Sequence, residues 1–279
     1  MNHTLEPPPS KVGVSNVATG DMLLPQHVDD LQRSGLSDAT IRSAGFYSET
    51  NSRHVADILH WQRGAARLGP CLVIPYLLAT GAPSGFARVK PDCPRQNREK
   101  PGRVTKYESP KGQPNRPYFT PGMIRTLRQI PLSGDREFVV ATEGEKKSLA
   151  ADQAGFPAIG LTGQWGWQKA RKKDAEDRKT GPRELLDELA AIIWTRFRVG
   201  IIHDTDPRRN PDVHHGFCEF ARVLHEHGAH VSFIPLPLGA RGADGLPGKV
   251  GVDDFIVSQG ADAFRQLIAA ALAQQELVQ

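Results

Sequence analysis

The chain has little cysteine and no long apolar run, and these absences exclude several classes of protein. Among its 279 residues, Cys71, Cys93 and Cys218 are widely spaced and form no CxxC pair, so neither a zinc ribbon nor a disulfide framework is indicated. No apolar run approaches the roughly 20 residues that span a bilayer. The first residues lack the apolar core of a signal peptide. We therefore expect a cytoplasmic protein with reduced thiols.

Motifs of several enzyme classes are also missing from the sequence. It contains no Gly-x-x-x-x-Gly-Lys-Ser/Thr segment, which excludes a fused P-loop helicase. It shows no nucleophile elbow and no evident Ser/His/Asp arrangement. The chemistry must therefore be sought among carboxylates and basic residues.

Positive charge is concentrated in one segment of the chain. The net charge is +4 and the pI about 9.0, but residues 88–128 contain eleven Lys/Arg against three acids, Asp92, Glu99 and Glu108. This local excess predicts a surface that binds a polyanion. The cations are Arg88, Lys90, Arg95, Arg98, Lys100, Arg103, Lys106, Lys111, Arg116, Arg125 and Arg128.

The pattern along the chain divides it into three parts. Residues 1–20 contain Pro, Ser and Gly with little periodicity, and we interpret them as a flexible tail. Residues 21–134 combine short helices, a β-hairpin and a basic loop, which predicts a smaller α+β basic subdomain. Residues 135–279 alternate strands and helices, which predicts an α/β fold with a parallel sheet covered by helices.

Individual elements are predicted from hydrophobic periodicity and capping residues. The hairpin is expected over 71–76 and 85–89. In the α/β part, strands are expected at 137–142, 157–161, 199–202 and 230–235. Helices are expected at 146–154, 183–194, 213–227, 254–258 and 261–273.

Acidic residues follow two of these strands. Glu143 comes after 137–142, and Asp204 and Asp206 come after 199–202. The carboxyl ends of parallel strands meet in one crevice, so these carboxylates are expected to converge there. Converging carboxylates repel unless they are protonated or neutralised, and oxygen ligands suit Mg²⁺ or Mn²⁺. Taken alone, Glu143 is better explained as a solvated loop acid, and Asp204 and Asp206 could serve as helix N-caps or turn residues. The two sites together, in one βαβα unit, are far more specific.

The order strand–Glu-Gly–helix, then strand–Asp-x-Asp–helix, resembles the Toprim domain that bacterial primases, topoisomerases and some nucleases share. The segment 249–255, Lys-Val-Gly-Val-Asp-Asp-Phe, resembles the Lys- and Asp-rich segment after the last strand of primases, although Lys249 is not adjacent to Asp253. An N-cap role for Asp253 or Asp254 is the alternative to a metal role.

The upstream half resembles the basic subdomain of bacterial primases. The likeness rests on Ile74-Pro75-Tyr76, on 85–88 (Gly-Phe-Ala-Arg) and on 106–112 (Lys-Tyr-Glu-Ser-Pro-Lys-Gly), where Glu108 replaces a polar residue of the family. The nearest likeness is to Toprim-like domains of phage and plasmid replication proteins, over about residues 25–275. No four-Cys zinc module is present.

The resemblance implies a Toprim-type fold and roles for particular residues. The catalytic acids would be Glu143, Asp204 and Asp206. The ligands of Mg²⁺ or Mn²⁺ would be Glu143, Asp204, Asp206, Asp253 and Asp254. The contacts to nucleic acid or nucleotide phosphates would be Arg88, Lys90, Lys106, Lys111, Arg116 and Lys147.

Three functions remain open at this point. The first is a metal-dependent primase-like nucleotidyltransferase that acts on single-stranded DNA during replication of a mobile element, with a helicase or another replication protein as a partner. The second is a Toprim nuclease that uses the same acids with water as the nucleophile. The third is a non-catalytic nucleic-acid-binding module with a degenerate Toprim fold.

Overall fold

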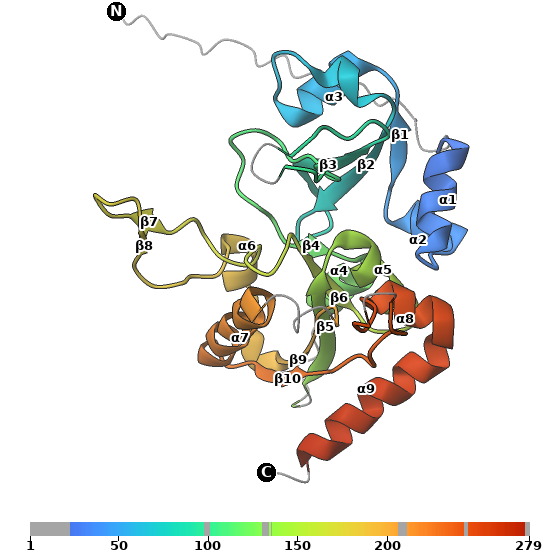
Figure 1. Cartoon of the computed structure of the whole chain (residues 1–279). Helices are drawn as coiled ribbons and strands as arrows, with labels where there is room; N and C mark the ends of the chain where they lie inside the picture. The colour runs from blue at the N-terminus through green and yellow to red at the C-terminus, as the bar shows by residue number, and fades with distance from the viewer. Residues whose placement is uncertain are drawn as a thin grey trace, which may run out of the picture.

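The computed structural model describes residues 23–97, 101–129, 134, 136–205, 211–242 and 245–276. These residues form two lobes, with the N-terminal lobe above the larger sheet in Figure 1. Both the predicted tail, residues 1–20, and Asp206 lie outside the described residues. No described helix is long and apolar enough to cross a membrane.

The N-terminal lobe is built around an antiparallel sheet with strand order β1-β2-β3 among the described residues. The predicted hairpin is confirmed, with Val73 opposite Val89. The Ser37 side chain caps α2 by accepting a hydrogen bond from the Thr40 amide. The elements are α1 (Pro25–Arg33), α2 (Asp38–Ser43), β1 (Tyr47–Glu49), α3 (Ser52–Leu59), η1 (Ala65–Leu68), β2 (Cys71–Leu77) and β3 (Pro83–Pro91).

The second lobe contains a sheet with strand order β10-β9-β5-β6-β4 in the described part of the chain. Strands β10, β9, β5 and β6 are parallel, and β4 joins the edge antiparallel to β6. The elements up to the insert after β6 are β4 (Tyr118–Phe119), α4 (Pro121–Arg128), β5 (Glu137–Glu143), α5 (Glu145–Gln153) and β6 (Ala158–Leu161). The remaining elements are β7 (Lys172–Lys173), β8 (Lys179–Thr180), α6 (Asp187–Ala190), η2 (Trp194–Arg196), β9 (Phe197–Ile202), α7 (Pro211–Glu226), β10 (His230–Phe233), α8 (Val252–Gln259) and α9 (Ala261–Glu276).

Helices cover both faces of this sheet because successive strand residues point to opposite sides. Val140 packs with residues of α5, α8 and α9, whereas its neighbours Val139 and Ala141 pack with residues of α4 and α7. Strands buried on both faces are typical of parallel sheets between helix layers. The predicted α/β fold, with a mostly parallel sheet flanked by helices, is confirmed.

One predicted helix is wrong over most of its length. The pattern at 183–194 predicts a continuous helix, but the structure contains α6 and, further on, η2. The Leu186 amide donates to the Trp167 carbonyl, and the Lys169 amide donates to the Glu184 carbonyl. These bonds hold 184–186 extended beside 167–169. The apolar residues are still buried, Leu185 and Leu189 among them, but through turns rather than one helix face.

Candidate active site

Two of the acidic residues predicted at the strand ends, Glu143 and Asp204, lie at the same edge of the sheet. Strands β5 and β9 are parallel neighbours in the register Thr142↔Ile202. Glu143 is the last residue of β5, and Asp204 follows β9 by two residues. The parallel register therefore brings both residues to one side of the molecule, as the sequence predicts.

Asp204 is buried and held by two lysines. Its side chain is 4% exposed. The Lys147 Nζ, from the first turn of α5, donates to both carboxylate oxygens at 2.6 Å. The Lys249 Nζ lies 2.7 Å from Oδ2. Two cations thus compensate a carboxylate that burial alone would disfavour in its charged form.

Asp253 reaches the same place from the start of α8. A Cβ atom built on Gly251 would lie 2.6 Å from Lys147 Cε, 2.9 Å from Asp253 Oδ1 and 3.0 Å from Asp204 Oδ1. The two carboxylates and the lysine stem therefore converge on a space that a glycine leaves open. Asp253 Oδ1 is buried without a hydrogen-bond partner among the described residues. A buried carboxylate oxygen of this kind is a suitable ligand for a cation or a water molecule.

Asp254 has a different role from its neighbour. Its Oδ2 accepts from the Gly251 amide at 2.9 Å, which caps α8, and the residue is exposed. The cap alternative thus accounts for Asp254, whereas Asp253 faces the cluster.

Burial raises the pKa of two acids of this cluster. The pKa of Glu143 is raised by burial and by the charge of Asp204, although Lys147 and Lys249 oppose the rise. The pKa of Asp253 is raised by burial and by Asp254, against the attraction of Lys147. Shifts of this kind arise where carboxyl groups are buried, and they are common at functional sites.

The chemistry of the donor set fits a hard divalent cation. Glu143, Asp204 and Asp253 offer carboxylate oxygens, the donors that Mg²⁺ and Mn²⁺ prefer. Among the described residues, no group of three or more acidic, His or Cys side chains already has the spacing of a metal site. The Lys147 and Lys249 ammonium groups supply the positive charge beside Asp204. A metal would have to displace at least one of them from Asp204.

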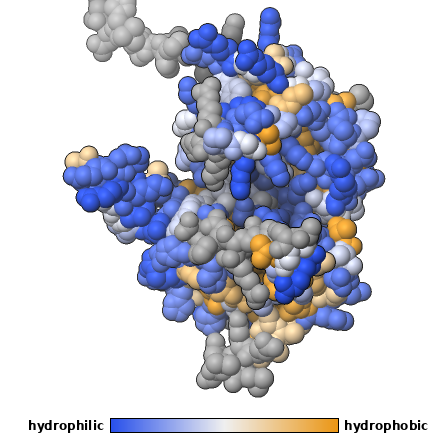
Figure 2. Space-filling model, viewed as in Figure 1, coloured by the Kyte–Doolittle hydropathy of each residue, from blue (hydrophilic) through white to orange (hydrophobic). Residues whose placement is uncertain are grey.

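The cluster opens onto a cleft between the two lobes. The cavity has a volume of about 730 Å³, and a strongly hydrophilic hollow is visible between the lobes in Figure 2. Residues of both lobes line the cavity: Arg88, Asn97, Lys106, Tyr107, Glu143, Gly144, Glu145, Lys146, Lys147, Leu161, Thr162, Gly163 and Asp253.

The predicted phosphate contact Arg88 lines this cleft but is held by a buried acid. Its Nη1 donates to Glu145 Oε1 at 2.6 Å, and the Tyr76 hydroxyl donates to the same oxygen at 2.6 Å. The Arg88 side chain is 12% exposed and lies 4.8 Å over the Tyr107 ring. The sequence predicts no role for Glu145, and it places Tyr76 only within the Ile74-Pro75-Tyr76 motif. The available signal was a tyrosine on the strand face that carries Leu72 and Ile74.

The other predicted contacts are distributed unevenly. Lys106 is exposed and lines the cleft. Lys90 pairs with Asp30 at 2.5 Å, and Asp30 also receives Lys146 at 3.3 Å. Burial raises the pKa of Asp30, but the Lys90 hydrogen bond and the charge of Lys146 outweigh it and hold that pKa below its usual value. Burial lowers the pKa of Lys146, in part against the attraction of Asp30.

Lys111 and Arg116 lie away from the acids. Lys111 lines a separate cavity of about 990 Å³ on the N-terminal lobe, together with Trp61 and Arg95. Arg116 pairs with Glu188 of α6 at 2.7 Å. The structure therefore brings Lys106 and Lys147 to the cleft with the acids but does not bring Lys111 or Arg116 there.

Comparison with known proteins identifies the fold. A family model described as a domain of unknown function (DUF3854) matches residues 133–263. An uncharacterized protein of Picosynechococcus sp. is 31% identical over 127 residues, which are 45% of this chain and 12% of the relative. The chain therefore covers a small part of that relative's length.

Solved structures with a similar fold are catalytic parts of bacterial primases. The Aquifex aeolicus primase structure, with zinc-binding and RNA polymerase domains, matches with a TM-score of 0.58 and 13% identity, over 89% of this chain and 56% of that one. The DnaG primase catalytic domain bound to single-stranded DNA matches with a TM-score of 0.52 and 14% identity, over 88% and 74%.

A third structure, the RNA polymerase domain of the Mycobacterium tuberculosis primase DnaG, matches with a TM-score of 0.52 and 13% identity, over 87% and 75%. The chain has the fold of a primase catalytic core. At these identities the likeness concerns the fold, and the chain spans just over half of the Aquifex structure.

Proposed function

We propose that the protein is a metal-dependent, primase-type nucleotidyltransferase that acts on single-stranded DNA. The observation that carries the proposal is the convergence of Glu143, Asp204 and Asp253 with Lys147 at the carboxyl edge of a parallel sheet. This cluster opens onto a cleft whose opposite wall is the basic N-terminal lobe. Carboxylates that hold divalent ions beside a basic groove are an arrangement that catalyses phosphoryl chemistry on nucleic acid.

The acidic and basic residues of the cleft would have different roles. Glu143, Asp204 and Asp253 would hold Mg²⁺ or Mn²⁺, with Asp206 as a further candidate ligand outside the described residues. The bound ion would stabilise the negative charge that develops on the phosphate oxygens. Lys147 and Lys249, when released from Asp204, would attract phosphates of the incoming nucleotide. The exposed Lys106 would contact the template backbone from the other wall.

Two further lines support a primase-type function. The solved structures compared above are primase domains, and one of them is bound to single-stranded DNA. The sequence resembles Toprim domains of phage and plasmid replication proteins at the strand-end acids. By the same resemblance, we propose that the protein serves the replication of a mobile element beside a helicase or another replication protein.

A primer-synthesis assay tests the proposal. Labelled nucleoside triphosphates and unlabelled single-stranded DNA are incubated in Mg²⁺ or Mn²⁺ with wild type, with Asp204→Asn and with the control Asp262→Asn. Asp262 lies on α9 with a side chain that is 89% exposed. We expect short labelled products from wild type and the control. We expect a loss of at least about a hundredfold in Asp204→Asn, since such groups contribute several kcal/mol to the transition state.

The same reaction, repeated with labelled template, separates the alternatives. If the template is shortened and no new product forms, the protein is a nuclease that uses the same acids, and not a polymerase. The pairing of Asp204 with Lys147 and Lys249 favours the alternative of a non-catalytic binding module, because these lysines already neutralise the carboxylate. Template binding with neither product nor cleavage, in every metal tested, would establish that alternative and refute the proposal.

A further inference from the structure

A basic hairpin leaves the second lobe beside the cleft. We call residues 169–183 the basic arm. Its strands β7 and β8 extend away from the body at the left of Figure 1, and the same projection is almost entirely hydrophilic in Figure 2. The arm contains seven Lys/Arg against the three acids Asp174, Glu176 and Asp177, a net charge of +4. The proposed chemistry uses none of these residues.

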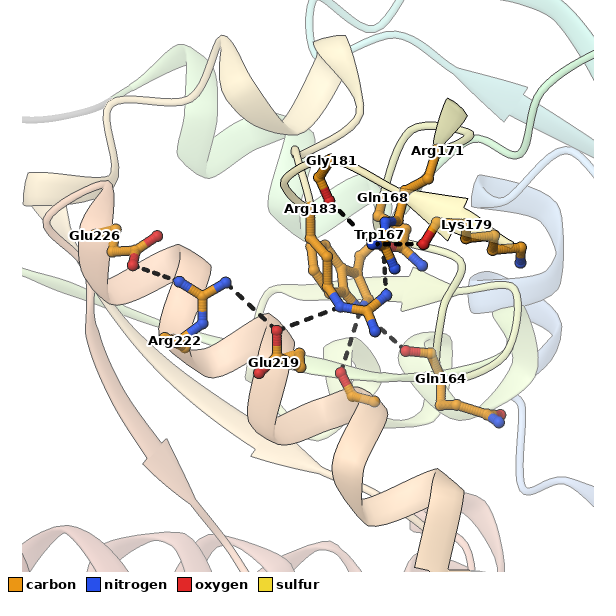
Figure 3. Close-up of polar contacts among 11 residues, drawn as sticks. Gln164, Trp167, Gln168, Arg171, Lys179, Gly181, Arg183, Glu219, Arg222 and Glu226 are labelled. Atoms are coloured by element: carbon orange, nitrogen blue, oxygen red, sulfur yellow. Dashed lines mark hydrogen bonds and ion pairs between the residues drawn. The ribbon is translucent and has the colours of Figure 1, made fainter. Parts of the chain in front are cut away.

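The base of the arm is rigidly fixed to the body. Trp167 is fully buried, and its indole N–H donates to the Gln164 carbonyl at 3.0 Å and the Gly216 carbonyl at 3.3 Å. Arg183 lies 4.1 Å over the Trp165 ring and pairs with Glu219 of α7 at 3.3 Å. Figure 3 shows the Trp167 hydrogen bonds and the Arg183–Glu219 pair, which join α7 to the root of the arm.

The hairpin itself is also internally braced. Arg171 Nη2 donates to the carbonyls of Lys179 and Gly181, both at 3.0 Å. At the tip, the Asp174 carboxylate accepts from the Arg178 amide at 2.8 Å, and Asp177 has a left-handed φ of 62°. A braced hairpin loses little conformational entropy when it binds a partner.

The arrangement of lysines on the hairpin favours an anionic partner. Lys173 and Lys179 are directly opposite each other in the β7–β8 register, and like charges in that position destabilise a strand pair. Lys173 finds one acid, Asp177, at 2.7 Å. Lys172 and Lys179 are exposed and make no ion pair within the part of the chain that the structure describes. Phosphate groups beside Lys173 and Lys179 would relieve the repulsion between them.

The arm begins at the wall of the cleft. Leu161, at the end of β6, and Thr162 and Gly163 after it line the cavity that contains the acids. The arm follows within a few residues. A single strand that leaves the cleft on this side would therefore pass along the hairpin.

From this placement we propose that the basic arm binds the phosphate backbone of single-stranded DNA outside the cleft, with Lys172 and Lys179 as its principal contacts. The inference rests on the proposed function because it assumes that the cleft takes single-stranded DNA. It adds a second contact region that extends the length of strand bound.

Two matched variants test the arm. Lys172→Gln/Lys179→Gln removes two positive charges from the hairpin. Arg42→Gln/Arg53→Gln removes two exposed positive charges from α2 and α3 of the other lobe. Binding of fluorescent oligo-dT of about 5 and about 30 nucleotides is measured across a salt series, since single-strand-binding modules cover roughly 4–16 nucleotides.

For the long oligonucleotide, we expect the plot of log affinity against log salt to be shallower by about 1.4 in the arm variant, because each single-strand phosphate contact contributes about 0.7. Binding of the short oligonucleotide, and both slopes of the control, should match wild type. If the arm variant binds the long oligonucleotide with the wild-type slope, the arm inference is overturned while the proposed function stands. If wild type binds neither oligonucleotide, the proposed function fails as well.

Discussion

At the scale of single residues, the site is governed by how buried carboxylates are neutralised. Asp204 has two lysine partners, whereas Asp253 leaves one buried oxygen without any among the described residues. Buried charge without compensation is unfavourable by several kcal/mol. Lysines compensate Asp204, and the proposed metal would take over part of that role. Small changes in charge should therefore alter the stability of the protein and its affinity for the proposed metal.

The raised pKa of Glu143 predicts a pH-dependent stability difference. Burial moves this pKa above its ordinary value of 4.5. At pH values between the unfolded-state pKa and the folded-state pKa of Glu143, the folded state binds more protons than the unfolded state. The free energy of unfolding therefore falls as pH rises through this range. Glu143→Gln cannot titrate. Its free energy of unfolding relative to wild type should therefore increase as pH rises above about 4.5 and then level off.

Urea unfolding of both proteins at a series of pH values measures this difference. Asp253 titrates in the same direction but is present in both proteins, so its contribution cancels. A difference that stays constant with pH, or that shrinks as pH rises, would show that burial does not destabilise the charged form of Glu143.

The sequence predicts the positions of Glu143 and Asp204 because short apolar runs identify the strands that carry them. It does not predict that Lys147 and Lys249 meet at Asp204, because that contact joins residues far apart in the chain. The sequence also does not decide whether Asp254 is a metal ligand or a helix cap. The distinction between Asp253 and Asp254 depends on which carboxylate turns back to cap α8, and local spacing is the same for both.

At the scale of elements, a buried ion pair joins the first lobe to the second. Glu145 in α5 accepts from Arg88 in β3 and from Tyr76 in β2. The Glu145 and Arg88 side chains are 4% and 12% exposed. Two strands of one lobe are thereby tied to the helix that also positions Lys147. Arg88 and Glu145 both line the cleft, so the contact also contributes to its charge.

Removing one partner of this pair should destabilise the protein strongly. Glu145→Gln leaves the Arg88 guanidinium buried without its carboxylate, which typically lowers the free energy of unfolding by about 3–5 kcal/mol. Tyr76→Phe removes one hydrogen bond and should lower it by about 1–2 kcal/mol. Both are measured by urea unfolding. The double variant Arg88→Met/Glu145→Gln should recover part of the loss, and a double variant less stable than Glu145→Gln alone would contradict this account.

Elements differ in how well their sequences predict them. The strands and helices around β5 and β9 are predicted well because each apolar run in the sequence corresponds to one buried element. The segment 183–194 is not, since hydrogen bonds from Lys169 and Leu186 to distant carbonyls replace the helical ones. The basic run at 169–173 indicates charge, but its hairpin depends on the tip around Asp174.

At the scale of the whole molecule, the two lobes share one hydrophobic core. Leu72, Ile74 and Tyr76 of β2 pack in the same cluster as Val140 and Leu149 of the second lobe. The sheet of the second lobe also includes a strand from the first part of the chain. This strand, β4, comes from the segment that the sequence assigns to the basic subdomain. It pairs with β6 through Tyr118↔Gly160.

This sharing predicts how fragments of the chain behave. A fragment of residues 135–279 follows the sequence-based boundary but lacks β4 and α4. It would leave the β6 edge unpaired and uncover the apolar cluster that buries Phe119, Met123 and Ile124 in the intact protein. Open sheet edges and exposed apolar faces promote association. A fragment of residues 116–279 restores both elements, so it should be more soluble and unfold more cooperatively in urea. Equal solubility and equal unfolding transitions would mean that β4 and α4 are dispensable and that residue 135 is a true domain boundary.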